Sequence, residues 1–274
     1  MVLGSHYPSQ SMSSLDQAAA DVVARPRLDG ARRRYADASR AIDPARAELI
    51  DVQLAAAALQ RASAQPRRFE ALTARASELL AAHQSRWLTG SSLAAAQPRW
   101  SRGFVEQLSM TPTAFLAQAP ALFATAPLLG LELTTADGFA ELCASPWLTR
   151  LAWLDAFDQP VGDAGAIALA DSPGAGTLVW LDLGHAGVGR AGIEALAGSS
   201  GLGGLRYVNL AGNPGGDPTD RIAGQDGDHL AAFETRPLGR ELEARFGPIG
   251  WLHWQPNDAA WYPPRPEGLV ALEE

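Results

Sequence analysis

The sequence contains no lysine, only one cysteine and no long apolar run, and each of these shortages limits what the chain can be. A single cysteine, Cys143, excludes a disulfide within the chain, and its apolar, helical surroundings predict a buried side chain and not a reactive thiol. No segment approaches the length of a membrane span, and the N-terminus lacks the basic-then-apolar order of a secretory signal. We therefore expect a cytoplasmic protein without a membrane segment. The use of arginine alone as the cation is typical of a high-GC bacterial gene and indicates no mechanism.

Charge is unevenly distributed along the 274 residues. Residues 20–103 contain 14 arginines against 8 acidic residues, whereas residues 104–274 contain 8 arginines against 21 acidic residues. This division predicts two domains with different partners. With 47% hydrophobic residues the chain can bury a sizeable core, and its net charge of −8 argues against a nucleic-acid partner.

Aliphatic residues recur every 27 residues in the second half of the chain. The repeated pattern is Leu151-x-x-Leu154, then Leu178-x-x-Leu181-x-Leu183, then Leu205-x-x-Val208-x-Leu210. Two more units, beginning at Val105 and Leu128, precede these at a shorter step. Because such a period is the sequence signature of stacked structural units, each unit predicts a short strand, a turn and a helical segment.

Residues 104–254 resemble the leucine-rich-repeat family, in particular the long repeats of the ribonuclease inhibitors. The resemblance implies an α/β solenoid with parallel strands on its concave face and helices on its convex face. The buried asparagine that follows the strand in this family is present here as Asn213, but Gln159 and Ala186 occupy its place in the two preceding units. We expect a looser turn in those two units.

Residues 20–103 are rich in alanine, leucine and arginine at helical spacing, which predicts three or four helices. We expect breaks at Asp43-Pro44, near Gln65-Pro66 and near Gly90-Ser91. The remaining segments are a flexible leader at 1–19 and a C-terminal tail at 255–274.

Two stretches in this helical segment, Arg32-Arg-Arg-Tyr35-Ala36-Asp37 and Pro44-Ala-Arg46-Ala-Glu48-Leu49, resemble the repeat-companion domain. That module is found at the N-terminus of many leucine-rich-repeat proteins of myxobacteria and planctomycetes, and it implies a helical cap on the apolar end of the solenoid. The alternative is an anion-binding patch formed by Arg32, Arg33 and Arg34 with Arg67 and Arg68. The cap is favoured, because helical arginines mostly face solvent or pair with acids of the same chain.

Side chains alternate across a strand, so the residues between the repeated leucines should line the concave face in columns. The aromatic column is Gln107, Gly130, Trp153, Trp180 and Tyr207, and the polar column is Ser109, Glu132, Asp155, Asp182 and Asn209. A third column contains Phe157, and a sixth strand at 249–254 would add Trp251 to the aromatic column.

Exposed rings beside carboxylates favour a protein partner with a basic surface, through ion pairs and cation–π contacts. We therefore predict a partner-binding site formed by Trp153, Trp180, Tyr207, Trp251, Glu132, Asp155, Asp182, Asn209 and Phe157. The alternative is that the rings only shield the sheet or pack on an internal segment such as the acidic loop 212–236. We expect no catalytic residues, and the oligomeric state is left open.

One motif is typical of nucleotide-binding enzymes, since Gly187-Val-Gly189-Arg-Ala-Gly192 matches G-x-G-x-x-G before a helix. The repeat explains it better, because Gly162 and Gly165 stand one unit earlier at the positions of Gly189 and Gly192. We therefore expect no nucleotide cofactor, with a nucleotide-dependent enzyme as the alternative. The acidic loop 212–236 lacks the residue order of a calcium loop, and we expect no metal there.

Overall fold

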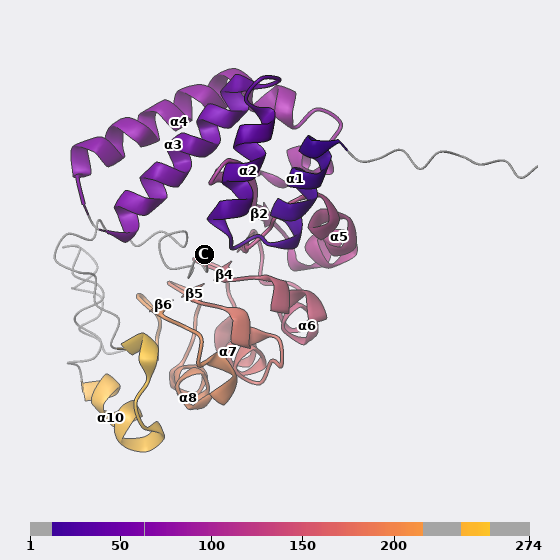
Figure 1. The fold of residues 1–274 in the computed structure, drawn as a ribbon. Helices are drawn as coiled ribbons and strands as arrows, with labels where there is room; N and C mark the ends of the chain where they lie inside the picture. Colours follow the sequence, from indigo (N-terminus) through magenta and orange to yellow (C-terminus); the bar gives the residue numbers. More distant parts are fainter. Residues whose placement is uncertain (1–12, 63, 216–236, 253–274) are drawn as a thin grey trace, which may run out of the picture.

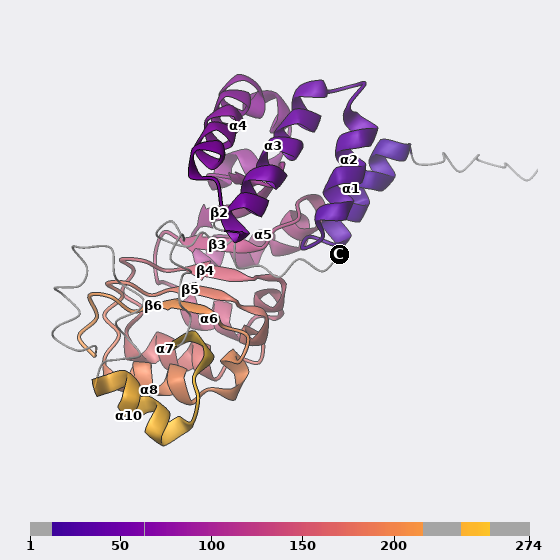
Figure 2. The same ribbon diagram turned by 60° about the vertical axis from the view of Figure 1, so that its left-hand side comes forward.

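The computed structural model describes residues 13–62, 64–215 and 237–252. Its first part is a group of four helices, α1 (Ser14–Ala24), α2 (Asp29–Ser39), α3 (Pro44–Arg61) and α4 (Pro66–Trp87). Figures 1 and 2 show this group at the end of the sheet where β2 lies. The helical prediction for this segment is confirmed.

The three predicted helix breaks are also confirmed, since α4 ends at Trp87, just before the third one near Gly90-Ser91. The first two breaks have a clear local cause. The Asp43 carboxylate accepts a hydrogen bond from the backbone N–H of Arg46 at 3.1 Å, and Pro44 occupies the first helical position. Gln65 has a left-handed backbone with φ 53° just before Pro66. The leader was predicted too long, because Ser13 caps a helix that already begins at Ser14.

The second part contains a six-stranded sheet within the described residues. Its strands are β1 (Arg99–Ser101), β2 (Phe104–Met110), β3 (Gly130–Leu133), β4 (Trp153–Asp155), β5 (Trp180–Asp182) and β6 (Tyr207–Asn209). They lie side by side in chain order, with β1 antiparallel to β2 and all later pairs parallel. The antiparallel strand β1 was not predicted. It joins β2 through Gly103, whose φ of 85° and close approach to Ile50 leave no room for a side chain.

Helices and 3-10 turns connect the parallel strands. The helices are α5 (Pro112–Thr125), α6 (Phe139–Ala144), α7 (Gly162–Ala170) and α8 (Arg190–Gly198), and α10 (Pro237–Phe246) follows later. The 3-10 turns between parallel strands are η2 (Pro146–Arg150), η3 (Ala175–Thr177) and η4 (Ser200–Leu202), while η1 (Ser92–Ala96) precedes β1 and η5 (Gly250–Leu252) follows α10. Figures 1 and 2 show α5 to α8 following one another along one side of the strands. The architecture is therefore α/β with a mostly parallel sheet.

The repeated leucines form the core between the sheet and these helices. Leu108, Leu131, Leu154, Leu181 and Val208 are directly opposite one another on successive strands, and all are buried. They belong to one apolar cluster with residues of α5 to α8. None of the helices in the described ranges has the length and apolarity that a bilayer crossing requires.

The turn after the strand keeps the same backbone in three successive units, contrary to the expected loosening. Asp158, His185 and Gly212, each 27 residues apart, all have positive φ, at 57°, 54° and 71°. The backbone N–H of Asp158 donates to the Gly184 carbonyl at 2.8 Å, and that of His185 donates to the Ala211 carbonyl at 2.8 Å. Because these bonds link one unit to the next, the turn does not depend on a buried asparagine in every unit.

The sixth repeat strand predicted at 249–254 is wrong. Residues Gly250–Leu252 form the 3-10 turn η5, and His253 and Trp254 lie outside the described residues. Like Leu148 of η2 and Leu202 of η4, Leu252 of η5 is buried in the main core. A short apolar run fits a strand and a helical turn equally well, and here it belongs to the turn.

Candidate functional site

The aromatic column forms with the predicted register, but its rings are not exposed. Gly130, Trp153, Trp180 and Tyr207 are paired directly across β3 to β6. Only 1% of Trp153, 7% of Trp180 and 3% of Tyr207 is accessible, and Trp251 in η5 is 9% accessible. The expectation that these four rings present an exposed aromatic surface is therefore wrong.

The rings are buried because they lie over neighbouring strands and do not project from the sheet. The Trp153 indole covers Gly130, and its Nε1 donates to Gln107 Oε1 at 3.3 Å. Trp180 stacks on Tyr207 with ring centroids 5.4 Å apart and planes 16° apart. The three rings form a second apolar cluster with Leu129, Ala152 and Val179, separate from the leucine core. This arrangement agrees with the alternative that the rings shield the sheet.

The polar column also has the predicted register, and its acids remain partly exposed. Glu132, Asp155, Asp182 and Asn209 lie opposite one another on β3 to β6. The same local bond orients the last three, since each side chain accepts from the backbone N–H two residues later, at 3.0 Å, 2.8 Å and 3.0 Å respectively. These turns hold the side chains at the carboxyl ends of the strands.

No cation of the described residues forms an ion pair with Asp155 or Asp182. Glu132 is paired with Arg99 at 2.5 Å, and Asp182 accepts from the Asn209 amide at 2.9 Å. Burial raises the pKa of Asp155 to about 6; the Phe157 N–H opposes this, and the charges of Asp182 and Glu132 add to it. Burial likewise raises the pKa of Asp182.

Phe157 is the one predicted aromatic residue that is clearly exposed, at 49%. Its ring packs edge-on against His185, with centroids 5.5 Å apart, and covers Gly184. A hollow of about 720 Å³ lies at the β2 end of the polar column, and Thr89, Arg99 and Ser109 are among its lining residues. Since Ser109 belongs to the column and Arg99 contacts Glu132, the hollow lies next to the acids of the column.

The Gly187–Gly192 turn is filled by the protein itself. The Asp163 carboxylate of the preceding unit accepts from the backbone N–H of Gly192 at 2.8 Å, at the start of α8. A Cβ at Gly189 would lie 2.6 Å from Asp163 Oδ2. A phosphate bound at this helix start would take the place that Asp163 occupies, so the glycines allow close packing of one unit on the next.

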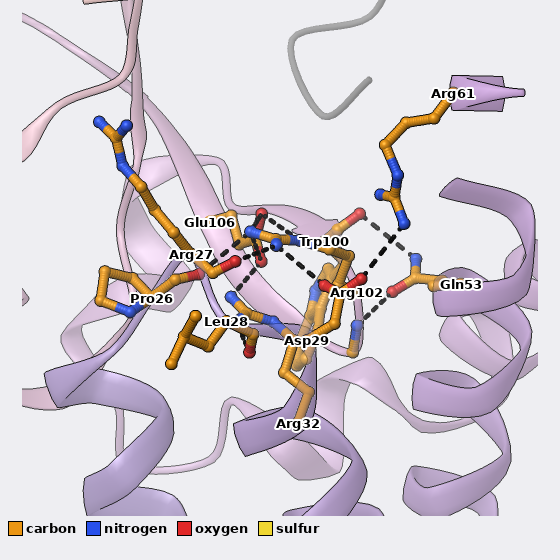
Figure 3. Close-up of polar contacts among 11 residues, drawn as sticks. Pro26, Arg27, Leu28, Asp29, Arg32, Gln53, Arg61, Trp100, Arg102 and Glu106 are labelled. Carbon is orange, nitrogen blue, oxygen red and sulfur yellow. Dashed lines mark hydrogen bonds and ion pairs between the residues drawn. The ribbon is translucent and has the colours of Figure 1, made fainter. Parts of the chain in front are cut away.

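Burial removes Arg32 from the alternative anion-binding patch, whereas Arg67 and Arg68 of that patch are exposed. The Arg32 guanidinium is fully buried and contacts the Glu106 carboxylate of β2, whereas Arg33 and Arg34 are exposed and Arg34 pairs with Asp21. Figure 3 shows Arg32 pointing toward Glu106 beneath the α1–α2 turn. The arginines of one run thus have different partners.

Arg102 completes a buried charge cluster between the helices and the sheet. It donates to Asp29 at 3.1 Å and to Glu106 at 3.0 Å, and also to the carbonyls of Arg27 and Pro26 (Figure 3). Arg61 reaches Asp29 at 3.3 Å from α3. Sequence reasoning missed this cluster, although the charged Glu106 within an apolar strand was a signal for it.

No protein-family model, curated protein or solved structure matches this chain. Within the described ranges, no group of His, Cys, Asp and Glu residues is arranged to hold a metal ion, and most of the acidic loop 212–236 lies outside those ranges. Cys143 is buried, and burial raises the pKa of its thiol to about 12, as an unreactive cysteine requires.

Proposed function

We propose that this chain is a cytoplasmic leucine-rich-repeat protein with a repeat-companion-type cap, and that it binds a basic segment of a partner protein along its polar column. The proposal makes it a non-enzymatic interaction module. The constant 27-residue step, the strand register and the strand-to-helix turns held by backbone bonds support the repeat assignment.

The unpaired carboxylates of Asp155 and Asp182 are the observation that carries the binding proposal. They face the same side of adjacent strands, and neither forms an ion pair within the described part of the chain. Arg99 indicates the complementary chemistry, since it already binds the neighbouring Glu132. An arginine or lysine of the partner would occupy equivalent positions along the column.

The aromatic rings support the face without contacting the partner in this proposal. The apolar cluster that contains Trp153, Trp180 and Tyr207 packs on the sheet beside the acids and fixes their spacing. Phe157 remains as the exposed ring available for contact beside Asp155. Neighbouring acids are about 4.8 Å apart, so an extended chain crossing the strands spans several repeats.

The test measures binding of short, capped, extended peptides rich in arginine, compared with peptides carrying glutamine in place of arginine. We expect Asp155→Asn with Asp182→Asn to weaken arginine-dependent binding at least tenfold, because both charges of the site are removed. Glu141→Gln, an exposed acid on α6, is the matched control and should bind as the parent does. Equal binding by the double variant and the parent, or no arginine-dependent binding at all, would contradict the proposal.

The nucleotide-dependent alternative has less support, because Asp163 fills the anion position at the start of α8. Adding NAD, FAD or ATP and measuring the melting temperature distinguishes the two functions. We expect no shift with any of the three. A saturable rise in the melting temperature with one of them would contradict the interaction proposal and favour a nucleotide cofactor site.

A further inference from the structure

The hollow at the β2 end of the polar column is lined by hydrogen-bonding side chains. Its volume of about 720 Å³ lies within the range of about 300–1,000 Å³ that ligand sites in proteins have. α4, η1, β1 and β2 all contribute to its walls, and the polar lining residues include Gln84, Ser85, Thr89, Gln97, Arg99 and Ser109. Among the described lining residues there is no aspartate or glutamate, and Arg99 carries the charge.

Ser109 brings a hydroxyl group without a partner to the wall of this hollow. The residue is only 7% accessible, and it lies directly opposite Glu132 of β3. Its hydroxyl forms no hydrogen bond within the described ranges, yet it is not among the enclosed, unpartnered side-chain atoms of those ranges. The Ser109 hydroxyl therefore faces the open space of the hollow and is free to donate to a bound group.

Arg99 lies between the hollow and the acids of the column. Its side chain is 63% exposed, and its Nη2 contacts Glu132 Oε2 at 2.5 Å. A guanidinium has five N–H donors in a planar fork, and Nε and Nη1 of Arg99 form no hydrogen bond in the part of the chain that the structure describes. The donors at the hollow are thus followed, along the same face, by the carboxylates of Asp155 and Asp182.

We propose that this hollow binds the C-terminal carboxylate of the partner's basic segment. The inference rests on the proposed function and adds to it the end of the partner chain. The carboxylate accepts hydrogen bonds from the Ser109 hydroxyl and from the free donors of Arg99, which is the side chain best suited to a carboxylate. The preceding residues of the partner cross the strands toward Asp155 and Asp182.

Strand spacing determines where the basic residues of the partner lie. Neighbouring strands are about 4.8 Å apart, so β4 lies about 10 Å and β5 about 14 Å from β2. An extended chain advances about 3.3 Å per residue, which puts the basic residues about three and about four to five positions before the last residue. Asp155 takes the nearer one and Asp182 the farther one.

The first test needs no variant and compares two extended peptides that have arginines three and five positions before the last residue. One peptide ends in a free carboxylate and the other in a carboxamide. Isothermal titration calorimetry of the unmodified protein at constant ionic strength measures both affinities. We expect the free acid to bind about tenfold more tightly, because its carboxylate gains charge-assisted hydrogen bonds.

The sign of this difference is informative. Residues 104–274 contain 21 acidic residues against 8 arginines, so general attraction to the acidic part of the chain would favour the more positive carboxamide. A preference for the free acid therefore requires a specific site for the carboxylate.

Two variants test whether that site is the hollow. Arg99→Gln should abolish the preference for the free acid, and because it also releases Glu132, the carboxamide should bind it at least as tightly as the parent. Ser109→Ala should reduce the preference, since the hydroxyl donor is removed. Ser77→Ala, an exposed serine of α4 outside the lining, is the matched control and should keep the full preference. Melting temperatures show that each variant is folded.

The outcomes separate this inference from the proposed function. Equal affinity for the two peptides, or a preference for the free acid that Arg99→Gln and Ser109→Ala both leave intact, would overturn the inference while arginine-dependent binding persists. Absence of arginine-dependent binding by either peptide would overturn both.

Discussion

The indole ring of Trp153 occupies the space that a side chain at Gly130 would fill. A Cβ on Gly130 would lie 1.6 Å from Trp153 Nε1, and only glycine lets the ring lie over β3. The small residue of one unit and the large residue of the next thus form a matched pair across two strands.

Replacing Trp153 with alanine should lower the free energy of unfolding by about 3–5 kcal/mol, because a fully buried indole leaves a cavity. Urea denaturation measures the loss. Phe157→Ala is the control, since this ring is half exposed, and it should cost less than about 1.5 kcal/mol. Similar losses for both variants would show that Trp153 is not buried in solution.

Gly130→Ala should destabilise the protein by about 1–3 kcal/mol, because the new methyl group displaces the Trp153 ring from the sheet. The near-ultraviolet circular dichroism of tryptophan should change with it. Gly30→Ala in α2 is the matched control, since its Cβ would meet only Arg34 at an ordinary 3.5 Å. We expect that change to stabilise by up to about 1 kcal/mol. A neutral Gly130→Ala would contradict the packing of this pair.

Glu106→Gln should cost about 3–5 kcal/mol, because it leaves Arg32 and Arg102 buried with less negative charge than they need. Chemical denaturation followed by helix and tryptophan signals measures the loss and shows whether the helices separate from the sheet. The control is Glu78→Gln, whose pair with Arg75 is exposed to solvent and should contribute little to stability. Equal effects would mean that the buried cluster does not hold the two parts together.

Stability should fall as the pH rises through the pKa of Asp155. Its folded pKa of about 6 lies above the ordinary 3.8, so the folded state binds this proton more tightly than the unfolded state. The stabilisation that protonated Asp155 gives the folded state is therefore fully present below pH 3.8 and is lost as the pH rises through 6. The free energy of unfolding should fall by about 1–3 kcal/mol over this range. Asp182 and Glu132 oppose the ionised form, whereas Arg99 favours it.

Asp155→Asn should flatten this pH dependence and stabilise the protein above pH 6. The variant keeps the turn, because Asn209 already accepts from the Ala211 N–H at the same place in a later unit. Urea denaturation of both proteins between pH 4.5 and 7.5 measures the difference. Parallel pH curves for the variant and the parent would show that Asp155 titrates normally.

The positions of the parallel strands β2 to β6 could be predicted because they depend on local and repeated features. Leu154, Leu181 and Val208 are spaced by the same step, and equal steps bring equivalent residues opposite one another in a parallel sheet. The same reasoning placed Asp155 beside Asp182. The sequence also marked the starts of α3 and α4, where Pro44 and Pro66 set the backbone directly.

Strand β1 was not predicted and turn η5 was predicted as a strand, because both elements depend on their neighbours in the fold. The three residues of β1 carry no alternating pattern long enough to recognise, and they pair with β2 through the turn at Gly103. The sequence of η5 is apolar enough to suggest a strand. In the structure it forms a 3-10 turn whose Leu252 is buried in the main core.

The amino-acid order alone determined the repeat, the register of both columns and the helical character of the segment predicted at 20–103, since backbone periodicity acts over short distances. Only the tertiary structure decided which columns face solvent and where the buried charges meet. Trp153 is hidden by its fit to Gly130 on another strand, and Arg102 meets Asp29 across 73 positions of the chain. Such contacts depend on the shapes and charges of side chains brought together by folding, which a linear pattern does not encode.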